Sequence, residues 1–158
     1  MVTLIIFIVL CSNLITSCFP AASTVSTFKV GDRLNRTSQL VSPGRIFTLG
    51  FFTIPETNYT YVGIWYTNDR QLRKVWVANP STPIISNSSV LMINPDTCKL
   101  IIATGGITLV NISDYQSGTI SNMSATLQDT GNFQLKNETD NQISSKVLII
   151  QTTYFCLV

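Results

Sequence analysis

Histidine is absent from the 158-residue chain, and charged side chains make up only 11% of it. Without histidine, the sequence excludes Ser-His-Asp and Cys-His nucleophile pairs and lacks the most common imidazole ligand of zinc. Soluble globular proteins contain about 25% charged residues, whereas ten lysines and arginines here face only eight acidic residues. With so few lysines and arginines, the chain lacks the clustered positive charge that nucleic-acid binding needs. We therefore expect neither a histidine-based enzyme nor a nucleic-acid-binding protein.

Cysteines are few, and their spacing does not suit a metal. Two of the four, Cys11 and Cys18, lie in the apolar N-terminal stretch, which leaves Cys98 and Cys156. Two cysteines allow one disulfide but do not make a disulfide scaffold. A bond between Cys98 and Cys156 and a pair of unpaired thiols stay equally open. No CxxC spacing occurs, and neither a metal site nor another cofactor is expected.

The N-terminus has the pattern of a secretory signal peptide. Residues 2–10 are apolar except for one threonine, small residues occupy positions 21–23, and the first charged side chain is Lys29. This pattern predicts a cleaved leader over residues 1–23. A membrane span would need about 20 consecutive apolar residues, and Ser12 interrupts the run. We therefore expect a secreted protein without a transmembrane span in its mature part.

Export would expose several asparagines to glycosylation. The chain contains six Asn-x-Ser/Thr sequons, which are acceptor sites in secreted proteins. Together with the leader they favour an oxidising, glycosylating route. The predicted glycosylation sites are Asn35, Asn58, Asn87, Asn111, Asn122 and Asn137.

Beyond the leader, no stretch keeps the apolar spacing of an amphipathic helix. Short β-prone runs alternate instead with turns rich in Gly, Pro, Asn and Asp. This alternation is typical of an all-β sandwich, barrel or prism. The predicted strands are Gln39–Val41, Ile46–Phe52, Tyr61–Tyr66, Lys74–Ala78, Val90–Ile93, Lys99–Ala103, Ile107–Asn111, Ser124–Gln128 and Asn132–Lys136.

An internal repeat narrows the choice of fold. The segments LVSPGRIFTLGFF, VLMINPDTCKLIIA and ATLQDTGNFQLKN each contain a short strand, a tight polar turn and a second strand, with Arg45, Lys99 and Asn132 at equivalent positions. Three such copies cannot bury a core singly, but they can do so around a common axis. Trp65 and Trp76 would also suit a sugar platform, yet both lie in apolar stretches and are expected in the core. The predicted bulky centre is Phe51, Phe52, Trp65, Tyr66 and Trp76.

Two catalytic patterns occur and neither is convincing. Asp129-Thr130-Gly131 spells the tripeptide of aspartic proteases, but one copy needs a symmetric dimer to form the pair of carboxylates that shares a proton. Asp-Thr-Gly is also an ordinary hairpin turn. Ser145 and Lys146 are adjacent, which does not create the geometry of a Ser-Lys pair. The sequence therefore predicts a protein without enzymatic activity.

Several motifs in a fixed order resemble a known family. The run GDRL…QLVSPGRIFTLGFF, the segments YVGIWY and VWVANPSTPI, and the run LQDTGNFQLKN lie between Val30 and Asn137. Together they resemble the bulb-type, mannose-specific lectin domain of plant S-locus glycoproteins and S-domain receptor-like kinases. The resemblance implies a β-prism II fold of three pseudo-symmetric four-stranded subdomains, which agrees with the repeat. It also implies an extracellular place, in the apoplast or at the cell surface.

The C-terminal residues 141–158 do not resemble the family. After the third repeat the family pattern is replaced by the segment SSKVLIIQTTYFCLV. We expect a lectin domain over residues 24–140 and a divergent hydrophobic tail over residues 141–158. The apolar end of this tail, residues 147–158, is too short to cross a bilayer. A true short protein and the misread end of a receptor gene both fit this pattern.

The resemblance also implies where a sugar would bind. Sugar-binding members carry Gln-x-Asp-x-Asn-x-Val-x-Tyr on one strand, so that alternate polar side chains share one face. The third repeat keeps Gln128 and Asn132, while Thr130 replaces the Asp, Gln134 the Val and Lys136 the Tyr. The candidate carbohydrate-binding site, with weakened affinity for mannose, is therefore Gln128, Thr130 and Asn132. The alternative is that these residues only cap a turn.

The other two repeats lack the polar set. Asp129 does not compensate for Thr130 in the third repeat, because on a regular strand it would point to the opposite face. In the second repeat the corresponding residues are Pro95, Thr97, Lys99, Ile101 and Ala103. In the first repeat they are Val41, Pro43, Arg45, Phe47 and Leu49.

Two functions follow from these observations. The first is a secreted, glycosylated lectin-like domain that binds a mannose-type glycan through side-chain amides and hydroxyls. The alternative is a protein-interaction module that binds an extracellular protein ligand or pairs with a full-length receptor-like kinase. The degenerate sugar motifs fit this alternative.

Overall fold

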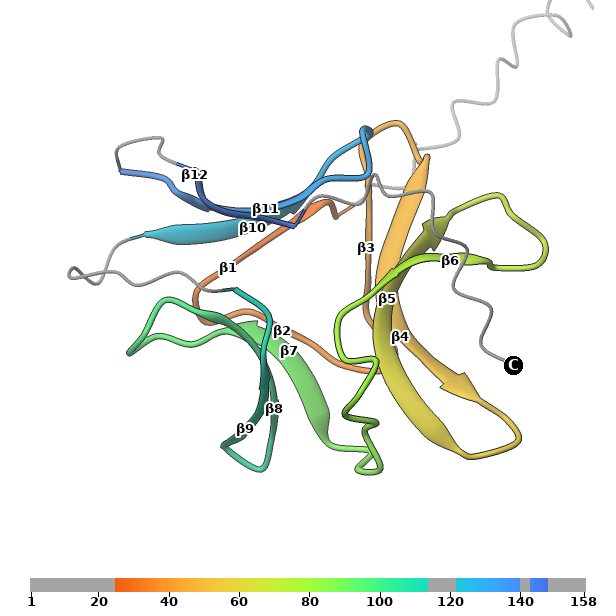
Figure 1. Cartoon of the computed structure of the whole chain (residues 1–158). Helices are drawn as coiled ribbons and strands as arrows, with labels where there is room; N and C mark the ends of the chain where they lie inside the picture. Colours follow the sequence, from red (N-terminus) through yellow and green to blue (C-terminus); the bar gives the residue numbers. More distant parts are fainter. Residues whose placement is uncertain (1–24, 114–121, 140–142, 148–158) are drawn as a thin grey trace, which may run out of the picture.

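The structure, a computed structural model, describes residues 25–113, 122–139 and 143–147. These residues form twelve strands and no helix, and the strands make three antiparallel four-stranded sheets. Figure 1 shows the three sheets arranged around a common centre, like the sides of a prism. The predicted all-β prism of three four-stranded subdomains is therefore confirmed.

Each sheet contains one of the three repeats. The first sheet, in the order β3-β4-β5-β6, consists of Gln39–Val41, Phe47–Ile54, Tyr59–Tyr66 and Lys74–Val77. The second sheet, in the order β2-β7-β8-β9, consists of Arg33–Leu34, Ser89–Ile93, Leu100–Thr104 and Ile107–Asn111. The third sheet, in the order β1-β10-β11-β12, consists of Thr27–Lys29, Met123–Leu127, Phe133–Asn137 and Ile143–Val147.

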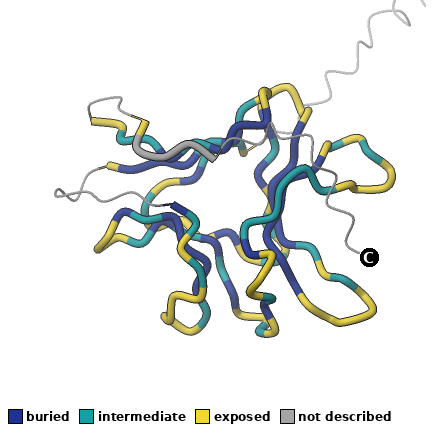
Figure 2. The backbone as a smooth tube through the Cα atoms, viewed as in Figure 1, coloured by how far each residue is buried: buried dark blue, intermediate teal, exposed yellow. Residues whose placement is uncertain are grey.

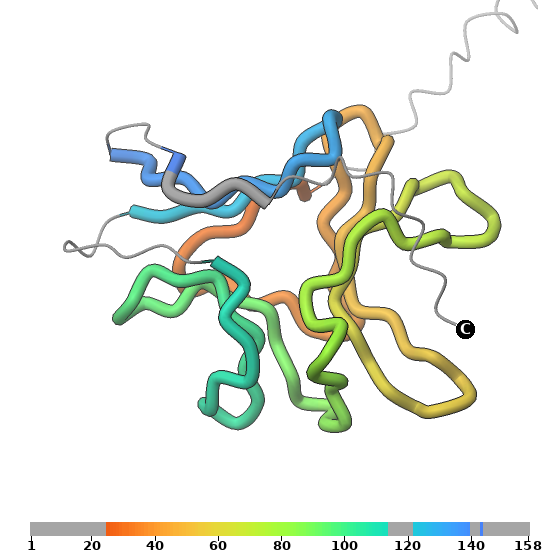
Figure 3. The backbone as a smooth tube through the Cα atoms, viewed as in Figure 1, coloured from red at the N-terminus to blue at the C-terminus, as the bar shows by residue number. Residues whose placement is uncertain are grey.

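One short segment near the N-terminus supplies an edge strand to every sheet. Within residues 27–41, β1 pairs with β10, β2 with β7, and β3 with β4. Figure 3 shows this segment in red and orange as it passes from sheet to sheet. Each sheet therefore reaches four strands only when this segment is in place.

All nine predicted strands are confirmed, with ends shifted by at most two residues. The sequence did not predict β1, β2 or β12, and the first two are only three and two residues long. In the described part of the chain, no helix has the length and apolar character needed to cross a membrane.

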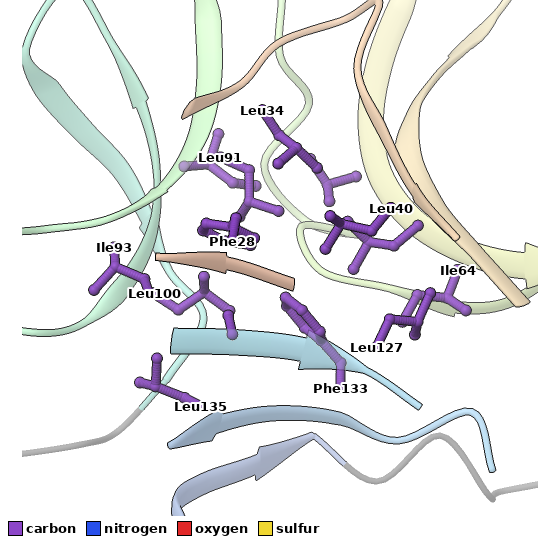
Figure 4. Close-up of a cluster of buried hydrophobic side chains, with 14 of the residues drawn as sticks. Phe28, Leu34, Leu40, Ile64, Leu91, Ile93, Leu100, Leu127, Phe133 and Leu135 are labelled. Carbon is purple, nitrogen blue, oxygen red and sulfur yellow. The ribbon is translucent and has the colours of Figure 1, made fainter. Parts of the chain in front are cut away.

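The inner faces of the three sheets meet in one hydrophobic core. Figure 4 shows side chains from all three sheets converging there, among them Phe28, Leu91 and Ile64. Figure 2 shows the same pattern along the backbone, because buried segments line the centre and exposed ones form the outer turns. The largest fully buried side chains are Phe133, Leu40, Leu49, Ile64, Ile84, Leu91, Ile93, Leu100, Ile102, Met123, Leu127 and Leu135.

The predicted bulky centre is only partly correct. Phe51 belongs to the core, and Trp76 packs against it. Trp65 is buried as predicted, but outside this central cluster. Phe52 is half-buried and Tyr66 is exposed, and neither belongs to the cluster. Leucine and isoleucine rather than aromatic rings therefore fill most of the centre.

The structure also shifts the register of the first repeat by one residue. The residue before the core-facing strand has a left-handed backbone in each copy, with φ of 56° at Arg45, 56° at Cys98 and 80° at Gly131. Arg45 is thus equivalent to Gly131, and Ile46 is equivalent to Lys99 and Asn132. The predicted equivalence of Arg45 and Asn132 is wrong because Phe47 and Leu49 face the core.

A matched pair of substitutions tests the shared core. Ile102 on β8 is fully buried, whereas Ile107 on β9 is 71% exposed. Ile102→Ala should lower the free energy of unfolding by about 2–5 kcal/mol, because it removes buried methyl groups and leaves a cavity. Ile107→Ala should change it by less than about 1 kcal/mol. Urea unfolding followed by tryptophan fluorescence measures both, and equal losses would contradict a core centred on Ile102.

Candidate functional site

The outer face of the first sheet is covered by aromatic rings and a lysine. Phe52 and Tyr61 stack with ring centroids 5.7 Å apart. The Nζ atom of Lys74 lies 4.6 Å from the Phe52 ring centroid and 4.7 Å from that of Trp65. Burial lowers the pKa of the Lys74 amine. Trp65 is only 6% exposed, so a sugar ring cannot stack on it as the face stands.

Two glycines allow these rings to lie flat on the sheet. A Cβ atom at Gly63 would come within 2.8 Å of the Phe52 ring, and one at Gly50 within 3.1 Å of the Trp65 ring. In the corrected register, the first-repeat positions equivalent to the third-repeat motif are Ser42, Gly44, Ile46, Thr48 and Gly50. This set does not contain the amide and carboxylate side chains of the sugar motif.

The outer face of the second sheet is apolar. Leu91 and Ile102 point into the core, so the residues that alternate with them point outward. Cross-strand pairs join Met92 to Ile101 and Val90 to Ala103 on this outer face. Ile101 and Ala103, at the positions equivalent to Gln134 and Lys136, are both buried.

The outer face of the third sheet is polar. The core-facing side chains of β10 and β11 alternate with Ser124, Thr126, Gln134 and Lys136. The hydroxyls of Thr27 and Thr126 share a hydrogen bond of 2.8 Å across β1 and β10. Among the described residues, this is the face on which side-chain amides and hydroxyls stand side by side.

The structure brings the predicted site residues together at the turn that leads into β11. The Gln128 backbone N–H donates to the Asn132 carbonyl over 2.9 Å, and the Gly131 N–H donates to the Gln128 carbonyl over 3.0 Å. The Gln128 side chain donates from Nε2 to Oε1 of Gln134 over 3.1 Å. Thr130 Oγ1 lies 3.4 Å from Gln128 Oε1. Gln134 stands where the sugar motif has a valine, and its side chain is part of the candidate site.

Asn132 differs from the other two predicted residues because it is nearly buried. It is 9% exposed, and its Oδ1 atom has no hydrogen-bond partner among the described residues. A buried acceptor without a partner costs about 1–3 kcal/mol. A ligand hydroxyl cannot reach this Oδ1 without a movement of the turn. Of the three predicted site residues, Asn132 is therefore the least accessible to a sugar.

Asp129 has a structural role between two subdomains. Both of its carboxylate oxygens accept the backbone N–H of Gly44, at 2.8 and 3.0 Å. The carboxylate thus points to the turn between β3 and β4, away from the side chains of Gln128 and Gln134. This contact agrees with the predicted opposite face and gives the Asp-Thr-Gly tripeptide a role other than proteolysis.

A charged group borders the polar face. The Ser124 hydroxyl donates to Oε1 of Glu138, and this hydrogen bond lowers the pKa of the Glu138 carboxyl, with Lys136 and Lys29 adding attraction. Because the folded-state pKa lies below the ordinary value, the interaction stabilises the fold at pH values above that range. Its contribution is lost as the pH falls through the lowered pKa.

Cysteines and acidic residues do not assemble a metal site in the described ranges, where no cluster of three or more such ligands occurs. Cys98 is buried and unbonded there, and Cys156 lies outside the described residues, so the disulfide stays a prediction. Of the predicted glycosylation sites, Asn137 is half-buried and the others, Asn35, Asn58, Asn87, Asn111 and Asn122, are exposed.

Comparison with known proteins identifies the family. Residues 74–149 match the profile of the family described as D-mannose binding lectin. The G-type lectin S-receptor-like serine/threonine-protein kinase B120 of Arabidopsis thaliana is 37% identical over 127 residues, which cover 77% of this chain. The chain belongs to the D-mannose binding lectin family. A second Arabidopsis thaliana receptor kinase of this type, SRK, is 35% identical over 127 residues and 78% of the chain.

Two solved lectin structures share the fold. A monomeric mannose-binding lectin from Gastrodia elata superposes with a TM-score of 0.54 at 15% identity, over 77% of this chain and 94% of that one. The Marasmius oreades lectin gives 0.55 at 12% identity, over 79% and 95%. By contrast, this lectin chain spans only 15% of the length of the B120 kinase and 14% of SRK.

The inter-subdomain contact of this lectin domain can be tested with a matched pair of aspartates. Asp129→Ala should lower the free energy of unfolding by about 1 kcal/mol, because the Gly44 N–H loses its acceptor. Asp96→Ala changes the equivalent turn of the second repeat, where the structure shows no side-chain hydrogen bond at this residue. Urea unfolding of both variants gives the comparison, and an Asp96→Ala loss as large as that of Asp129→Ala would refute the role of the contact.

The Ser124–Glu138 contact predicts a pH effect. Ser124→Ala should raise the pKa of Glu138 toward its ordinary value, because the hydrogen bond that lowers it most is removed. The stabilisation by Glu138 would then disappear at a higher pH than in the unsubstituted protein. Carbon-13 NMR titration of the Glu138 carboxyl measures the shift. Ser89→Ala, at a buried serine of the second sheet, should leave this titration unchanged.

Proposed function

We propose that this chain is an extracellular, non-enzymatic lectin domain that binds carbohydrate through the outer face of the third sheet. The observation that carries the proposal is the contrast between the three outer faces. The first is filled by aromatic rings and Lys74, the second is apolar, and the third presents amides and hydroxyls. Vicinal sugar hydroxyls both donate and accept hydrogen bonds, and the third face matches that chemistry.

The chemistry of this face needs no metal and no proton transfer. Each glutamine amide contains one carbonyl acceptor and two N–H donors. In the Gln128–Gln134 pair, one donor and one acceptor satisfy each other, which leaves the Gln134 Nε2 to donate to a ligand. The Thr27–Thr126 hydroxyl pair keeps lone pairs that accept from a ligand hydroxyl. These groups are held on paired strands, which favours binding over catalysis.

Extracellular placement rests on independent features. The leader-like residues 1–23 and the six sequons fit export. Five of these sequon asparagines are exposed, as glycosylation requires. The relatives are receptor-like kinases whose names include a lectin part, and export of that part agrees with these features.

Affinity for mannose itself is weakened in this proposal. The motif's aspartate is replaced by Thr130, and Asn132 is nearly buried. Loss of one charged acceptor costs about 1.5–3 kcal/mol, or roughly ten- to a hundredfold in Kd. A millimolar interaction with a single mannose unit is the expected result.

Restoring the missing carboxylate tests the proposal. Thr130→Asp should tighten binding of methyl α-mannoside by about tenfold or more, because a charged acceptor is regained beside Gln128. NMR chemical-shift titration measures the Kd, and the shifts should map to β10 and β11. Thr97→Asp adds the same charge at the equivalent turn of the second repeat and should have no effect. The proposal fails if mannoside, mannobiose and a broad glycan array all give no binding to either protein.

A second candidate function is protein interaction, which the apolar outer face of the second sheet favours. Met92 and Val90 are half-buried there, and their cross-strand partners Ile101 and Ala103 are buried. Pull-down of an exported receptor kinase by the unsubstituted chain, and its loss in Met92→Lys, would support this function. A monomeric chain that retains no receptor in both forms would count against it.

A further inference from the structure

Two lysines flank the candidate carbohydrate face in a single cross-strand row. Lys29 of β1 pairs with Ser124 of β10, and Ser124 pairs with Lys136 of β11. Directly paired residues lie on the same face of a sheet, so the three side chains stand on the polar outer face. The neighbouring row contains Thr27, Thr126 and Gln134. Two ammonium groups thus border the hydroxyls and amides that the proposed function uses.

Neither ammonium group has an ion-pair partner among the described residues. The nearby Glu138 carboxylate accepts the Ser124 hydroxyl instead, and it interacts with both lysines through space. The Asp32 carboxylate accepts the backbone N–H of Lys29 over 2.9 Å. Each of these carboxylates accepts a hydrogen bond from a neutral donor rather than from a lysine ammonium group. A ligand carboxylate would therefore compete with the through-space attraction of Glu138 for the two lysines.

The position of Lys136 makes this row relevant to the ligand. Lys136 follows Gln134 by two residues on β11, so both side chains share the face that carries the Gln128–Gln134 pair. A cation therefore stands at the edge of the candidate site.

We propose that this face selects carbohydrates that carry a carboxylate, namely uronic-acid sugars, over neutral sugars such as mannose. The inference rests on the proposed function and specifies its substrate class. A uronate would accept hydrogen bonds from the Lys136 and Lys29 ammonium groups, while its ring hydroxyls meet the Gln134 amide and the threonine hydroxyls. Such charge-assisted hydrogen bonds are about twice as strong as neutral ones.

The spacing of the two lysines allows both to serve one ligand. Neighbouring strands lie about 4.8 Å apart, so the Cα atoms of Lys29 and Lys136, two strands apart, are separated by roughly 10 Å. A lysine side chain has a flexible four-carbon stem, and two such stems can converge on one carboxylate or reach two along a chain. Because Lys29 is exposed and Lys136 is only half-buried, binding should weaken as salt is added.

A matched set of ligands tests the inference. Trigalacturonate, its fully methyl-esterified form, mannobiose and citrate are titrated into the full chain by isothermal calorimetry at low salt. The ester keeps the sugar skeleton and removes the charge, whereas citrate keeps carboxylates and removes the sugar. Trigalacturonate should bind at least about tenfold more tightly than any of the other three.

Matched lysine variants locate the effect. Lys29→Gln and Lys136→Gln should each weaken trigalacturonate binding by about threefold, and the double variant should remove most of the preference over the ester. Lys99→Gln removes the same charge from the turn before β8 in the second repeat and should have no effect. Unchanged thermal melts show that the variants are folded, and Lys29, which is exposed, provides the safer of the two substitutions.

Each other outcome overturns the inference in a distinguishable way. Equal binding of trigalacturonate and its ester, or tighter binding of mannobiose, would leave carbohydrate binding intact and refute the preference for uronates. Citrate binding as tight as that of trigalacturonate would show charge attraction without sugar recognition. No binding of any sugar would refute both the inference and the proposed function.

Discussion

The three sheets depend on one constraint, which is that residues 27–41 provide a fourth strand to each of them. Without this segment, β10, β7 and β4 would become edge strands with unpaired backbone groups. The apolar inner face of each sheet would also have no partner if the sheet stood alone. The segment therefore ties three local hairpin systems to a single core, in which Phe28, Leu34 and Leu40 represent its three strands. The core then fixes the inner face of every sheet, while the outer faces are free to change.

That freedom explains how one repeated architecture carries three different surfaces. The inner positions keep leucine, isoleucine and phenylalanine in all three copies, and each repeat keeps a left-handed residue before its core-facing strand. The outer positions contain stacked rings beneath Lys74 in the first sheet, aliphatic side chains in the second, and amides and hydroxyls in the third. Function is therefore assigned to one side of the prism on the basis of side-chain chemistry rather than of fold.

Most of the fold could be predicted from the sequence, because alternation and turn residues are local signals. The strands β1 and β2 could not be predicted, because segments of three and two residues are too short to show an alternating pattern. They are strands only because β10 and β7 pair with them. The sequence suggests the wrong register for the first repeat because it aligns Gly44 with Gly131, whereas the left-handed residue in the first repeat is Arg45.

The candidate site was predictable in part. The polar residues Gln128, Thr130 and Asn132 could be found from the motif, and the structure does bring them to one turn. The burial of Asn132 and the bond from Gln128 to Gln134 depend on neighbouring strands. The row of Lys29, Ser124 and Lys136 joins residues that are distant in the sequence, and only the cross-strand register reveals it.

The pairing of β1 with β10 also delays the folding of the N-terminal strand during protein synthesis. Phe28 lies opposite Ala125, so the first strand of the domain waits for a partner that is translated almost a hundred residues later. At about 5–20 residues per second, the wait is roughly 5–20 s. During that interval Phe28 is without the strand that pairs with it and without part of its core. Apolar side chains that stay exposed in this way promote aggregation during folding.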